Sequence, residues 1–494
     1  MKYISTRGAH SEGVSSAYAI KTGLAKDGGL FMPEQIPEIS LDFVKELSSL
    51  SYSERAAKVL SLFLSDYDYD ELLTDAQAAY SDKKFTPSPA PITELSNNKY
   101  MLELWHGPTS AFKDMALQIM PRLFVRALKK CGEEREALIL VATSGDTGKA
   151  ALEGYRDVPG TKIQVFYPMD GVSRVQKLQM QSQEGSNVAV CGISGNFDDA
   201  QNGVKRIFSD SNVAQKLNDG GVFLSSANSI NWGRLVPQIV YYISAYCDMY
   251  QSGAIELGDK IDVCVPTGNF GNIFACYIAK IMGLPVNKLI CASNKNNILT
   301  DFISTGVYDR NRNFYPTMSP SMDILISSNL ERLLYLLYGS ERCADCMKSL
   351  SENGRYELSA DELALLRESF IGYFTDEDAC METVKRTFIN ENRLIDTHTA
   401  VAVSAAERYM SDSEAKIPML VVSTASAYKF ASDVHLSLSA NKPENDLDAP
   451  LMLKELTGVD IPGPLEEILS KSAIHTGVCT PEDMTETVYR FALK

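Results

Sequence analysis

The feature that most constrains the fold is a repeated order of short apolar run, glycine-bearing loop and helix. Residues 137–142 form an apolar run, and residues 143–148 form a loop rich in glycine and hydroxyl groups. A helical pattern follows over residues 149–155, and the same order returns between residues 261 and 282. Apolar runs of this length, bounded by such loops, are typical of strands buried in a parallel sheet. The sequence therefore predicts an α/β fold with mostly parallel sheets and helices on both faces.

A chain of 494 residues is too long for one simple core, so we expect three parts. Residues 1–90 are predicted to form a small amino-terminal domain that ends in a polar, proline-bearing joint. Residues 91–255 form the first part of the α/β core, and residues 256–494 form the second. Within the second part, residues 321–395 have a mainly helical pattern, and we interpret them as an insertion rather than as part of a sheet.

Composition and charge restrict the classes of partner. A formal charge of −16 and an isoelectric point near 4.9 argue against nucleic acid or an anionic membrane as the main partner. No apolar run approaches the ~20 residues that span a bilayer, and the amino terminus lacks the apolar segment of a signal peptide. The ten cysteines are scattered, which suits the reducing cytoplasm. The one C-x-x-C pair, Cys343 and Cys346, lacks a second ligand pair, so we predict no metal site.

One lysine stands out by its position. Lys113 follows a Gly-Pro turn and opens an amphipathic stretch that predicts a helix over residues 113–128. The helix dipole and apolar neighbours would both favour a neutral amine there. Schiff-base chemistry with an aldehyde cofactor requires such an amine. Because most single lysines are surface residues, this interpretation depends on the two glycine-bearing loops.

The two loops have the chemistry of anion-binding sites. In residues 267–272, glycines allow main-chain N–H groups to turn toward an anion at a helix start, as in a phosphate site. The loop matches neither the Walker nor the dinucleotide pattern. Residues 143–148 carry more hydroxyl groups, which suits a carboxylate, although a plain capping loop is the alternative. A phosphate site, a carboxylate site and a lysine together indicate pyridoxal 5'-phosphate with an amino-acid substrate.

The motifs resemble those of the threonine synthase family. These motifs occur along the chain in the same order as in that family. They lie at residues 106–109 with 111–114, 144–148, 268–272, 396–400 and 423–425. The resemblance covers nearly the whole chain, including the amino-terminal unit, and is to the longer branch found in bacteria and fungi. It implies a fold type II pyridoxal-phosphate enzyme, similar to the tryptophan synthase β chain, with a small amino-terminal domain.

The resemblance also implies roles for individual residues. Lys113 would form the Schiff base with the cofactor and shuttle protons, and Thr424 would hydrogen-bond the pyridine nitrogen. Phe112 could pack against the cofactor ring, with ordinary core packing as the alternative. The cofactor phosphate would be held by Gly268, Asn269, Phe270, Gly271 and Asn272. The substrate carboxylate would be received by Ser144, Gly145, Asp146 and Thr147.

Further residues are candidates for substrate contact. His398 is placed near the site by the resemblance, with a helix-capping role as the alternative. For the substrate's own phosphate, the basic candidates are Lys177, Arg174, Arg234 and Lys429. Arg234 is the most suggestive of these, because it follows Asn231 in a segment between a strand and a helix.

The resemblance implies a pyridoxal-phosphate-dependent carbon–oxygen lyase acting on phosphate. It would convert O-phospho-L-homoserine and water to L-threonine and phosphate in threonine biosynthesis, by γ-elimination followed by β-addition through a Lys113 Schiff base. One alternative is a phospholyase that yields 2-oxobutyrate, ammonia and phosphate. Another is a non-catalytic relative that binds the cofactor. We expect a cytoplasmic protein that is a monomer, with a homodimer as the alternative.

Overall fold

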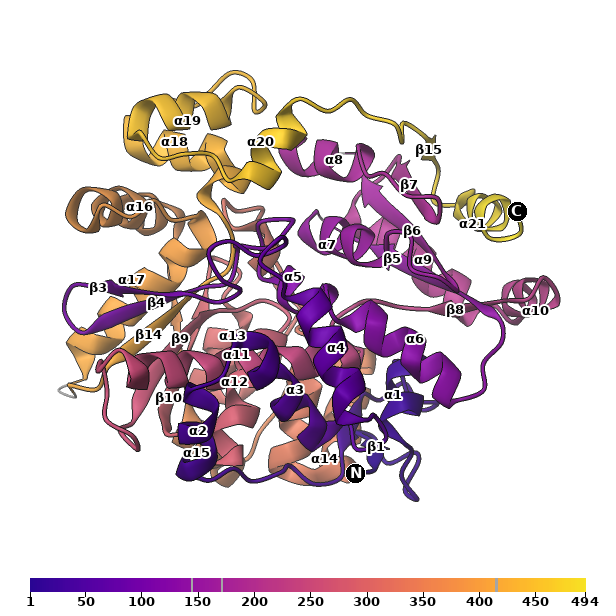
Figure 1. The fold of residues 1–494 in the computed structure, drawn as a ribbon, viewed down its shortest axis with the longest axis horizontal. Coiled ribbons are helices and arrows are strands. Elements are labelled where there is room, and N and C mark those ends of the chain that lie inside the picture. Colours follow the sequence, from indigo (N-terminus) through magenta and orange to yellow (C-terminus); the bar gives the residue numbers. More distant parts are fainter. Residues whose placement is uncertain (144, 170–171, 414–415) are drawn as a thin grey trace.

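Two separate β-sheets form the frame of the molecule. The computed structural model describes residues 1–143, 145–169, 172–413 and 416–494. The larger sheet contains β3 (Ile92–Leu95), β4 (Lys99–Glu103), β9 (Ile261–Pro266), β10 (Val286–Ser293), β13 (Phe370–Phe374) and β14 (Met419–Ser423). The smaller sheet contains β5 (Glu136–Ala142), β6 (Thr161–Pro168), β7 (Val188–Ile193), β8 (Val222–Ser225) and β15 (Val478–Cys479). Figure 1 shows the larger sheet beside the smaller one, each with its own helices.

Helices connect and cover the strands. They are α5 (Lys113–Leu117), α6 (Met120–Lys130), α7 (Asp146–Tyr155), α8 (Arg174–Gln181), α9 (Phe197–Ser209), α10 (Ser211–Asp219), α11 (Trp232–Gln251), α12 (Gly271–Met282), α13 (Ile298–Thr305), α14 (Leu330–Asn353), α15 (Ala360–Ser369), α16 (Glu377–Glu391), α17 (Thr397–Asp412), α18 (Ala431–Ser439), α19 (Ala449–Thr457), α20 (Gly463–Leu469) and α21 (Met484–Ala492). Short 3-10 turns lie at Pro320–Met322 and Ala427–Phe430, and a two-stranded ribbon joins β11 (Val307–Asp309) to β12 (Arg355–Glu357).

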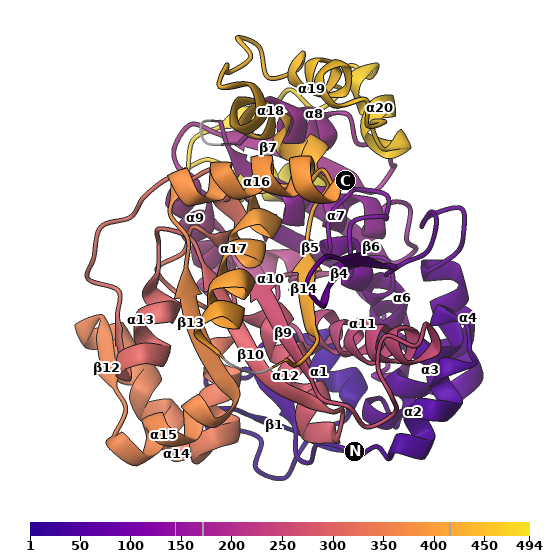
Figure 2. The same cartoon turned by 90° about the vertical axis from the view of Figure 1, so that its left-hand side faces the viewer.

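The larger sheet is buried on both faces. Its order is β13-β10-β9-β14-β4-β3, and every pairing is parallel except that of β3 with β4. Because side chains alternate along a strand, Val263 and Val422 pack into the main core with α11 and α12. Cys264 and Val421 point to the opposite face and pack with α17. Figure 2 shows β13, β10, β9 and β14 side by side in this sheet.

The smaller sheet also packs against hydrophobic residues on both faces. Its order is β15-β7-β6-β5-β8, with all pairings parallel. Ile139 and Val141 face the main core, whereas Leu138 and Leu140 face α9 and α21. The predicted α/β fold with parallel sheets and helices on both faces is therefore confirmed.

The two sheets do not follow the predicted division of the core at residue 255. β3 and β4 precede that point but pair with strands of the later part, and β15 belongs to the sheet of the earlier part. The central strand β14 comes from late in the chain and lies between β9 and β4. Local patterns cannot predict this arrangement, because strand order depends on contacts between distant segments.

The amino-terminal unit contains β1 (Tyr3–Ser5), α1 (Ser16–Thr22), β2 (Phe31–Pro33), α2 (Leu41–Ser48), α3 (Tyr52–Phe63) and α4 (Tyr69–Ala79). Its strands pair antiparallel, and its helices pack against α6 and α11. Residues such as Phe63 and Leu60 are fully buried in the same cluster as residues of the larger sheet. The unit therefore shares the main hydrophobic core.

Two local predictions differ from the structure. The expected helix over residues 113–128 is divided into α5 and α6, because Pro121, in the first turn of α6, has no N–H to donate back to the carbonyl of Leu117, the last residue of α5. The helix expected from residue 149 already begins at Asp146, so the end of the hydroxyl-rich loop is its first turn.

The predicted insertion at residues 321–395 also needs correction. Most of it is helical, but β13 within it is an edge strand of the larger sheet, parallel to β10. Its Gly372 has no room for a side chain, since a Cβ there would lie 2.9 Å from Cα of Thr300 in α13. A five-residue strand between helices carries little periodic signal of its own.

Among the described residues, no helix is long and apolar enough to cross a membrane. In the same part of the chain, His, Cys, Asp and Glu side chains nowhere gather in a group of three or more that could bind a metal ion.

Candidate active site

The turn before Lys113 is held by a buried carboxylate. Asp114 accepts hydrogen bonds from the main-chain N–H of Thr109 (2.8 Å) and from its hydroxyl (2.8 Å). Gly107 lies so close that a Cβ there would be 2.6 Å from Asp114 Oδ2, which explains the glycine. Burial raises the pKa of Asp114 to about 6, although the Thr109 hydrogen bonds oppose this shift. Asp114 therefore fixes the turn that leads into α5, where Lys113 is the first residue.

The Lys113 amine lies between two other segments. Its Nζ is 3.5 Å from Asp146 Oδ2 and 3.4 Å from Ser321 Oγ. Burial lowers the pKa of Lys113; Asp146 opposes this, and the cations Arg234 and Lys429 lower the pKa further. The direction agrees with the neutral amine that the sequence predicted, and burial is its main cause.

Asp146 is held as a carboxylate by a second buried lysine. Lys429 has a fully buried side chain, and its Nζ lies 3.0 Å from Asp146 Oδ1, which also accepts a 2.7 Å hydrogen bond from Gln176. Burial alone would raise the pKa of Asp146, but Lys429 and Lys113 outweigh it and hold the pKa well below its usual range. Lys429 was a candidate for the substrate phosphate, but the structure places it against Asp146.

The hydroxyl-rich loop ends in the first turn of α7. Gly145 caps this helix at φ 139°, where a Cβ would lie 2.7 Å from the Gln176 side chain. Its N–H donates to Thr143 Oγ1 over 3.0 Å. Thr147 is half-buried in the first turn, and Ser144 lies outside the described residues. The main-chain N–H groups of such a turn favour an anion, but the side chain of Asp146 is itself an anion.

The predicted phosphate loop follows β9 and begins α12. Phe270 adopts a left-handed conformation (φ 63°) just before the helix, and its ring packs 5.7 Å from that of Phe370. Its side chain is therefore part of the core, and only its main chain shapes the loop. The carbonyl of Asn269 accepts hydrogen bonds from the main chain (3.1 Å) and side chain (2.9 Å) of Asn329, which anchors the loop to the region before α14.

The loop lies directly against the segment that contacts Lys113. A Cβ on Gly268 would be 2.7 Å from the carbonyl oxygen of Ser321. The carbonyl of Gly268 accepts a 2.7 Å hydrogen bond from Ser327. Gly271, the first residue of α12, lies beside Asn329. The phosphate loop and the lysine are therefore joined through Ser321, although they are far apart in the sequence.

Asn272 has an unused donor. Its Oδ1 accepts hydrogen bonds from the hydroxyl groups of Tyr241 and Tyr242, both on α11. Its Nδ2 is buried and has no partner within the described part of the chain. A buried N–H without an acceptor is costly, so this atom suits a ligand that brings an oxygen.

The third predicted segment also reaches the lysine. Thr424 follows the end of β14, and its carbonyl accepts a 2.8 Å hydrogen bond from the N–H of Phe112. Its neighbour Ala425 forms an antiparallel bridge with Ala111. Phe112 is partly buried against the main core, and its ring centroid lies 5.5 Å from Lys113 Nζ. Residues 424 and 113 are therefore brought together by main-chain pairing.

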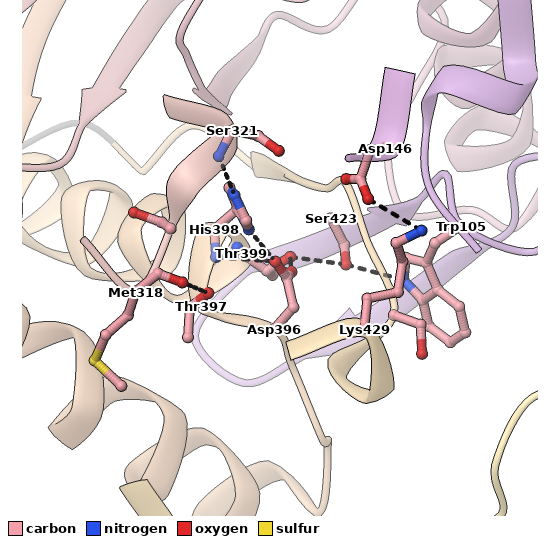
Figure 3. A network of polar contacts seen from close by, with 12 residues as sticks. Trp105, Asp146, Met318, Ser321, Asp396, Thr397, His398, Thr399, Ser423 and Lys429 are labelled. Carbon is pink, nitrogen blue, oxygen red and sulfur yellow. Dashed lines mark hydrogen bonds and ion pairs between the residues drawn. The ribbon is translucent and has the colours of Figure 1, made fainter. Parts of the chain in front are cut away.

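A buried polar network supports the Ser321 segment (Figure 3). The N–H of Ser321 donates to His398 Nε2 over 3.1 Å, and His398 Nδ1 lies 2.7 Å from Asp396 Oδ2. This pattern fits the neutral tautomer of His398 with its proton on Nδ1. Asp396 also accepts from Thr399, whose hydroxyl is 3.0 Å from that of Ser423. Both ring nitrogens of His398 are occupied by protein partners, so the histidine positions the segment rather than facing a substrate.

The structure gives Asn231 and Arg234 different surroundings. Asn231 is fully buried, its Oδ1 caps α11 by accepting from Gly233 N–H (2.9 Å), and its Nδ2 donates to the carbonyl of Ile20 (2.9 Å). The predicted substrate contact of Asn231 is therefore not supported, because its polar atoms join α11 to the amino-terminal unit. Arg234 is buried, and its Nη1 donates to the carbonyl of Ala227 over 2.8 Å. Among the described residues, no carboxylate lies within salt-bridge distance of it.

Burial also changes the pKa of Arg234. It lowers the pKa of the guanidinium to about 10. A buried cation that has no anionic partner in the described chain is suited to an anionic ligand.

Family comparisons agree with this geometry. Residues 2–80 match the family described as threonine synthase N terminus, and residues 399–460 match threonine synthase, C-terminal. Residues 85–425 match the pyridoxal-phosphate dependent enzyme family. The chain therefore belongs to the fold type II family of pyridoxal-phosphate-dependent enzymes, whose cofactor is pyridoxal 5'-phosphate.

Individual relatives narrow the assignment. The chain is 39% identical to human threonine synthase-like 1 over 91% of its own length and 61% of that protein. It is 38% identical to the threonine synthase of Pseudomonas aeruginosa, covering 88% of this chain and 90% of the relative. A crystal structure of pyridoxal-phosphate-bound threonine synthase from Brucella melitensis matches with a TM-score of 0.88 at 34% identity, covering 100% and 99% of the two chains. The chain belongs to the threonine synthase family.

The residues present fit this cofactor. Gly268 leaves no space for a side chain beside Ser321, the helix start at Gly271 offers main-chain N–H groups, and Asn272 Nδ2 lacks an acceptor within the described chain. Three contributors were not predicted from sequence: Ser321, Asp396 and the pairing of Lys429 with Asp146. The role of Asp396 could have been predicted from the sequence, since an aspartate two residues before a histidine at a helix start can both cap the helix and contact the histidine ring.

Proposed function

We propose that this protein is a threonine synthase, a carbon–oxygen lyase that converts O-phospho-L-homoserine and water to L-threonine and phosphate. The observation that supports this most is the convergence on Lys113 of the Ser321 segment beside Gly268 and of the Thr424 segment. The substrate would have a carboxylate and a phosphate, and the two buried cations Lys429 and Arg234 outnumber the one carboxylate of Asp146 there. This positive balance suits a substrate with two anionic groups.

The cofactor would be held by three parts of the chain. When bound, pyridoxal 5'-phosphate supplies an electron sink for the carbon next to the substrate amine. The first N–H groups of α12, with Asn272 Nδ2, would bind its phosphate. Thr424 would offer its hydroxyl to the ring nitrogen, and Phe112 would pack beside the ring. A hydroxyl leaves that nitrogen without a negative partner, which moderates the electron sink.

Lys113 would be the residue that moves protons. Its lowered pKa allows the free amine to accept the proton of the substrate Cα. After the amine has released that proton to water, it can accept the proton of Cβ. Asp146 would stabilise the protonated amine from 3.5 Å. The Ser321 hydroxyl, 3.4 Å from Nζ, would orient it. The His398–Asp396 pair would keep Ser321 in place through the hydrogen bond to its N–H.

The two anionic ends of the substrate would bind at opposite sides of the amine. The carboxylate would be received by Ser144 and by the main-chain N–H groups of Asp146 and Thr147 at the start of α7, while Gly145, whose N–H donates to Thr143, would shape the turn. The side chain of Asp146 cannot take part, because it is ionised. The substrate phosphate would pair with Arg234, whose burial makes an ion pair stronger than at the surface.

Product analysis tests this proposal. With O-phospho-L-homoserine and the cofactor-loaded protein, we expect phosphate release and L-threonine as the carbon product, followed by NMR. Lys113→Ala should lose turnover at least a thousandfold, whereas Lys99→Ala, at another buried lysine, should keep it. Formation of 2-oxobutyrate and ammonia would instead show a phospholyase. Absence of phosphate release from the wild type would show a non-catalytic relative.

We further propose that the protein acts in the cytoplasm as a monomer. Its cysteines are all free in the structure, which is consistent with a reducing compartment. The residues proposed for the site come from one chain, so the site needs no second copy. Sedimentation of the cofactor-loaded protein distinguishes the monomer from the homodimer.

A further inference from the structure

A cavity of about 420 Å³ lies where three elements meet, and its lining includes none of Lys113, Ser321 and Thr424. Its walls come from α4 and the joint after it, from one face of α6, and from the end of α7 with the turn that follows. The volume is within the range of small-molecule sites. We name it the junction cavity; its lining includes Lys84, Gln118, Arg122, Arg126, Glu153 and Arg156.

One buried amide in the junction cavity lacks an acceptor. Gln118 is 3% exposed, and its Oε1 accepts a 2.9 Å hydrogen bond from Lys84 Nζ. Its Nε2 is buried and has no hydrogen-bond partner among the residues that the structure describes. Leaving a buried donor unpaired is unfavourable, so a ligand oxygen in the cavity would satisfy it.

Two cations beside that amide are also without anions. No carboxylate of the described chain lies within 4.0 Å of the side-chain nitrogens of Lys84 or Arg122. Burial lowers the pKa of Lys84, and the neighbouring Arg122 lowers it further. The other two arginines of the lining differ, since Arg126 pairs with Asp75 and Arg156 lies 3.6 Å from Glu153. The carboxylates of Glu153 and Asp114 act on Lys84 only from beyond ion-pair distance, so Lys84 and Arg122 are two neighbouring cations without a direct anionic partner in the described chain.

The three groups together have the chemistry of a phosphate site. They present an ammonium, a guanidinium and an amide N–H, which are all donors, and two of them are positive. A guanidinium binds phosphate through two parallel hydrogen bonds, and an ammonium adds a point charge. We propose that the junction cavity binds a phosphate dianion, either free phosphate or the phosphate group of a small metabolite, between Lys84, Arg122 and Gln118. This site is separate from Lys113 and does not depend on the function proposed above.

Three variants test the site in the cofactor-loaded protein. Gln118→Glu keeps the size of the side chain but replaces the free donor with a carboxylate that pairs with Lys84. Lys84→Met with Arg122→Gln removes both cations. Lys83→Met with Arg490→Gln is the matched control, because it removes the same charge from exposed residues outside the cavity. Circular dichroism and cofactor absorbance of each variant show that folding and the Lys113 site are retained.

Binding is measured by isothermal titration calorimetry with inorganic phosphate and with glucose 6-phosphate as separate titrants. We expect at least a tenfold weaker dissociation constant in Gln118→Glu and in the Lys84/Arg122 variant, and no change in the control. Binding of inorganic phosphate alone assigns the cavity to the free ion, and binding of both titrants admits a phosphorylated metabolite. The proposal is overturned if the wild type binds neither titrant, or if the cavity variants bind as tightly as the wild type. Phosphate bound at the Lys113 site remains in all variants and so cannot mimic the loss.

Discussion

The buried pair of Lys429 and Asp146 gives the sharpest stability prediction. Both side chains are almost wholly inside the protein, and Lys429 Nζ also donates to the carbonyl of Thr109 (2.8 Å) and to Gln179 (3.1 Å). In Lys429→Met, the methionine fills the space of the chain, but Asp146 keeps only Gln176 and the more distant Lys113 as partners. A charge that has lost its main partner then remains buried.

The magnitude follows from the cost of breaking a buried pair, about 3–5 kcal/mol. We expect Lys429→Met to lower the free energy of unfolding by this amount. Asp146→Asn combined with Lys429→Met should cost less than Lys429→Met alone, because no unpaired charge is left. The coupling energy of the double-mutant cycle should therefore be about 2–3 kcal/mol.

Urea unfolding measures these differences in free energy. The transition is monitored by far-UV circular dichroism and by the fluorescence of the two tryptophans. All variants are compared with the cofactor removed, so that ligand binding does not contribute. The matched cycle uses Lys99 and Glu407, a pair at 2.7 Å whose carboxylate is 32% exposed, and should show coupling below about 1 kcal/mol. The reasoning is refuted if Lys429→Met costs under about 1 kcal/mol, or if its effect and that of Asp146→Asn are additive.

Three further predictions concern neighbouring groups. Because burial raises the pKa of Asp114 to about 6 from an ordinary 3.8, the native state binds this proton more tightly than the unfolded state. The resulting stability is complete below pH ~4 and is lost as the pH rises through 6. Between pH 5 and 8, the free energy of unfolding of the wild type should therefore fall by about 1.4 kcal/mol relative to that of Asp114→Asn. Equal pH profiles of the two proteins in urea unfolding would contradict this. Gly268→Ala places a Cβ 2.7 Å from Ser321 O and should weaken cofactor binding about tenfold in absorbance titrations, whereas Gly463→Ala, with nothing within 4 Å, should not. His398→Asn removes the acceptor of Ser321 N–H and should lower kcat about tenfold with little change in KM; an increase in KM alone would instead indicate substrate contact.

Local sequence patterns were sufficient for the parts of the fold that repeat. The strand, loop and helix order correctly located β5 with α7 and β9 with α12, because each apolar run is followed directly by its glycine turn. The same patterns placed Lys113 at a helix start. The same periodicity wrongly predicted one continuous helix over residues 113–128, because it gave no weight to Pro121.

Other parts depend on contacts that no local pattern contains. Nothing near Lys429 indicates that its partner is Asp146, and nothing near Ser321 indicates that it lies between Gly268 and the lysine. An asparagine before a helix can contact a ligand or cap the helix, and the contact of Asn231 with Ile20 favours the structural role, which no local pattern around Asn231 indicates. The roles of Gly145, Asn269 and Thr424 toward ligands remain predictions.

The place of β14 has a consequence for how the protein is synthesised. The ribosome makes β4 and β9 well before the strand that lies between them, so the larger sheet stays divided until β14 has been made. Thr424 directly follows that strand, and the main chain of Phe112 pairs with it. A nascent or truncated chain that ends before this point therefore cannot assemble the surroundings of its reactive amine. The insertion of this one strand therefore completes at once the larger sheet and the main-chain pairing beside Lys113.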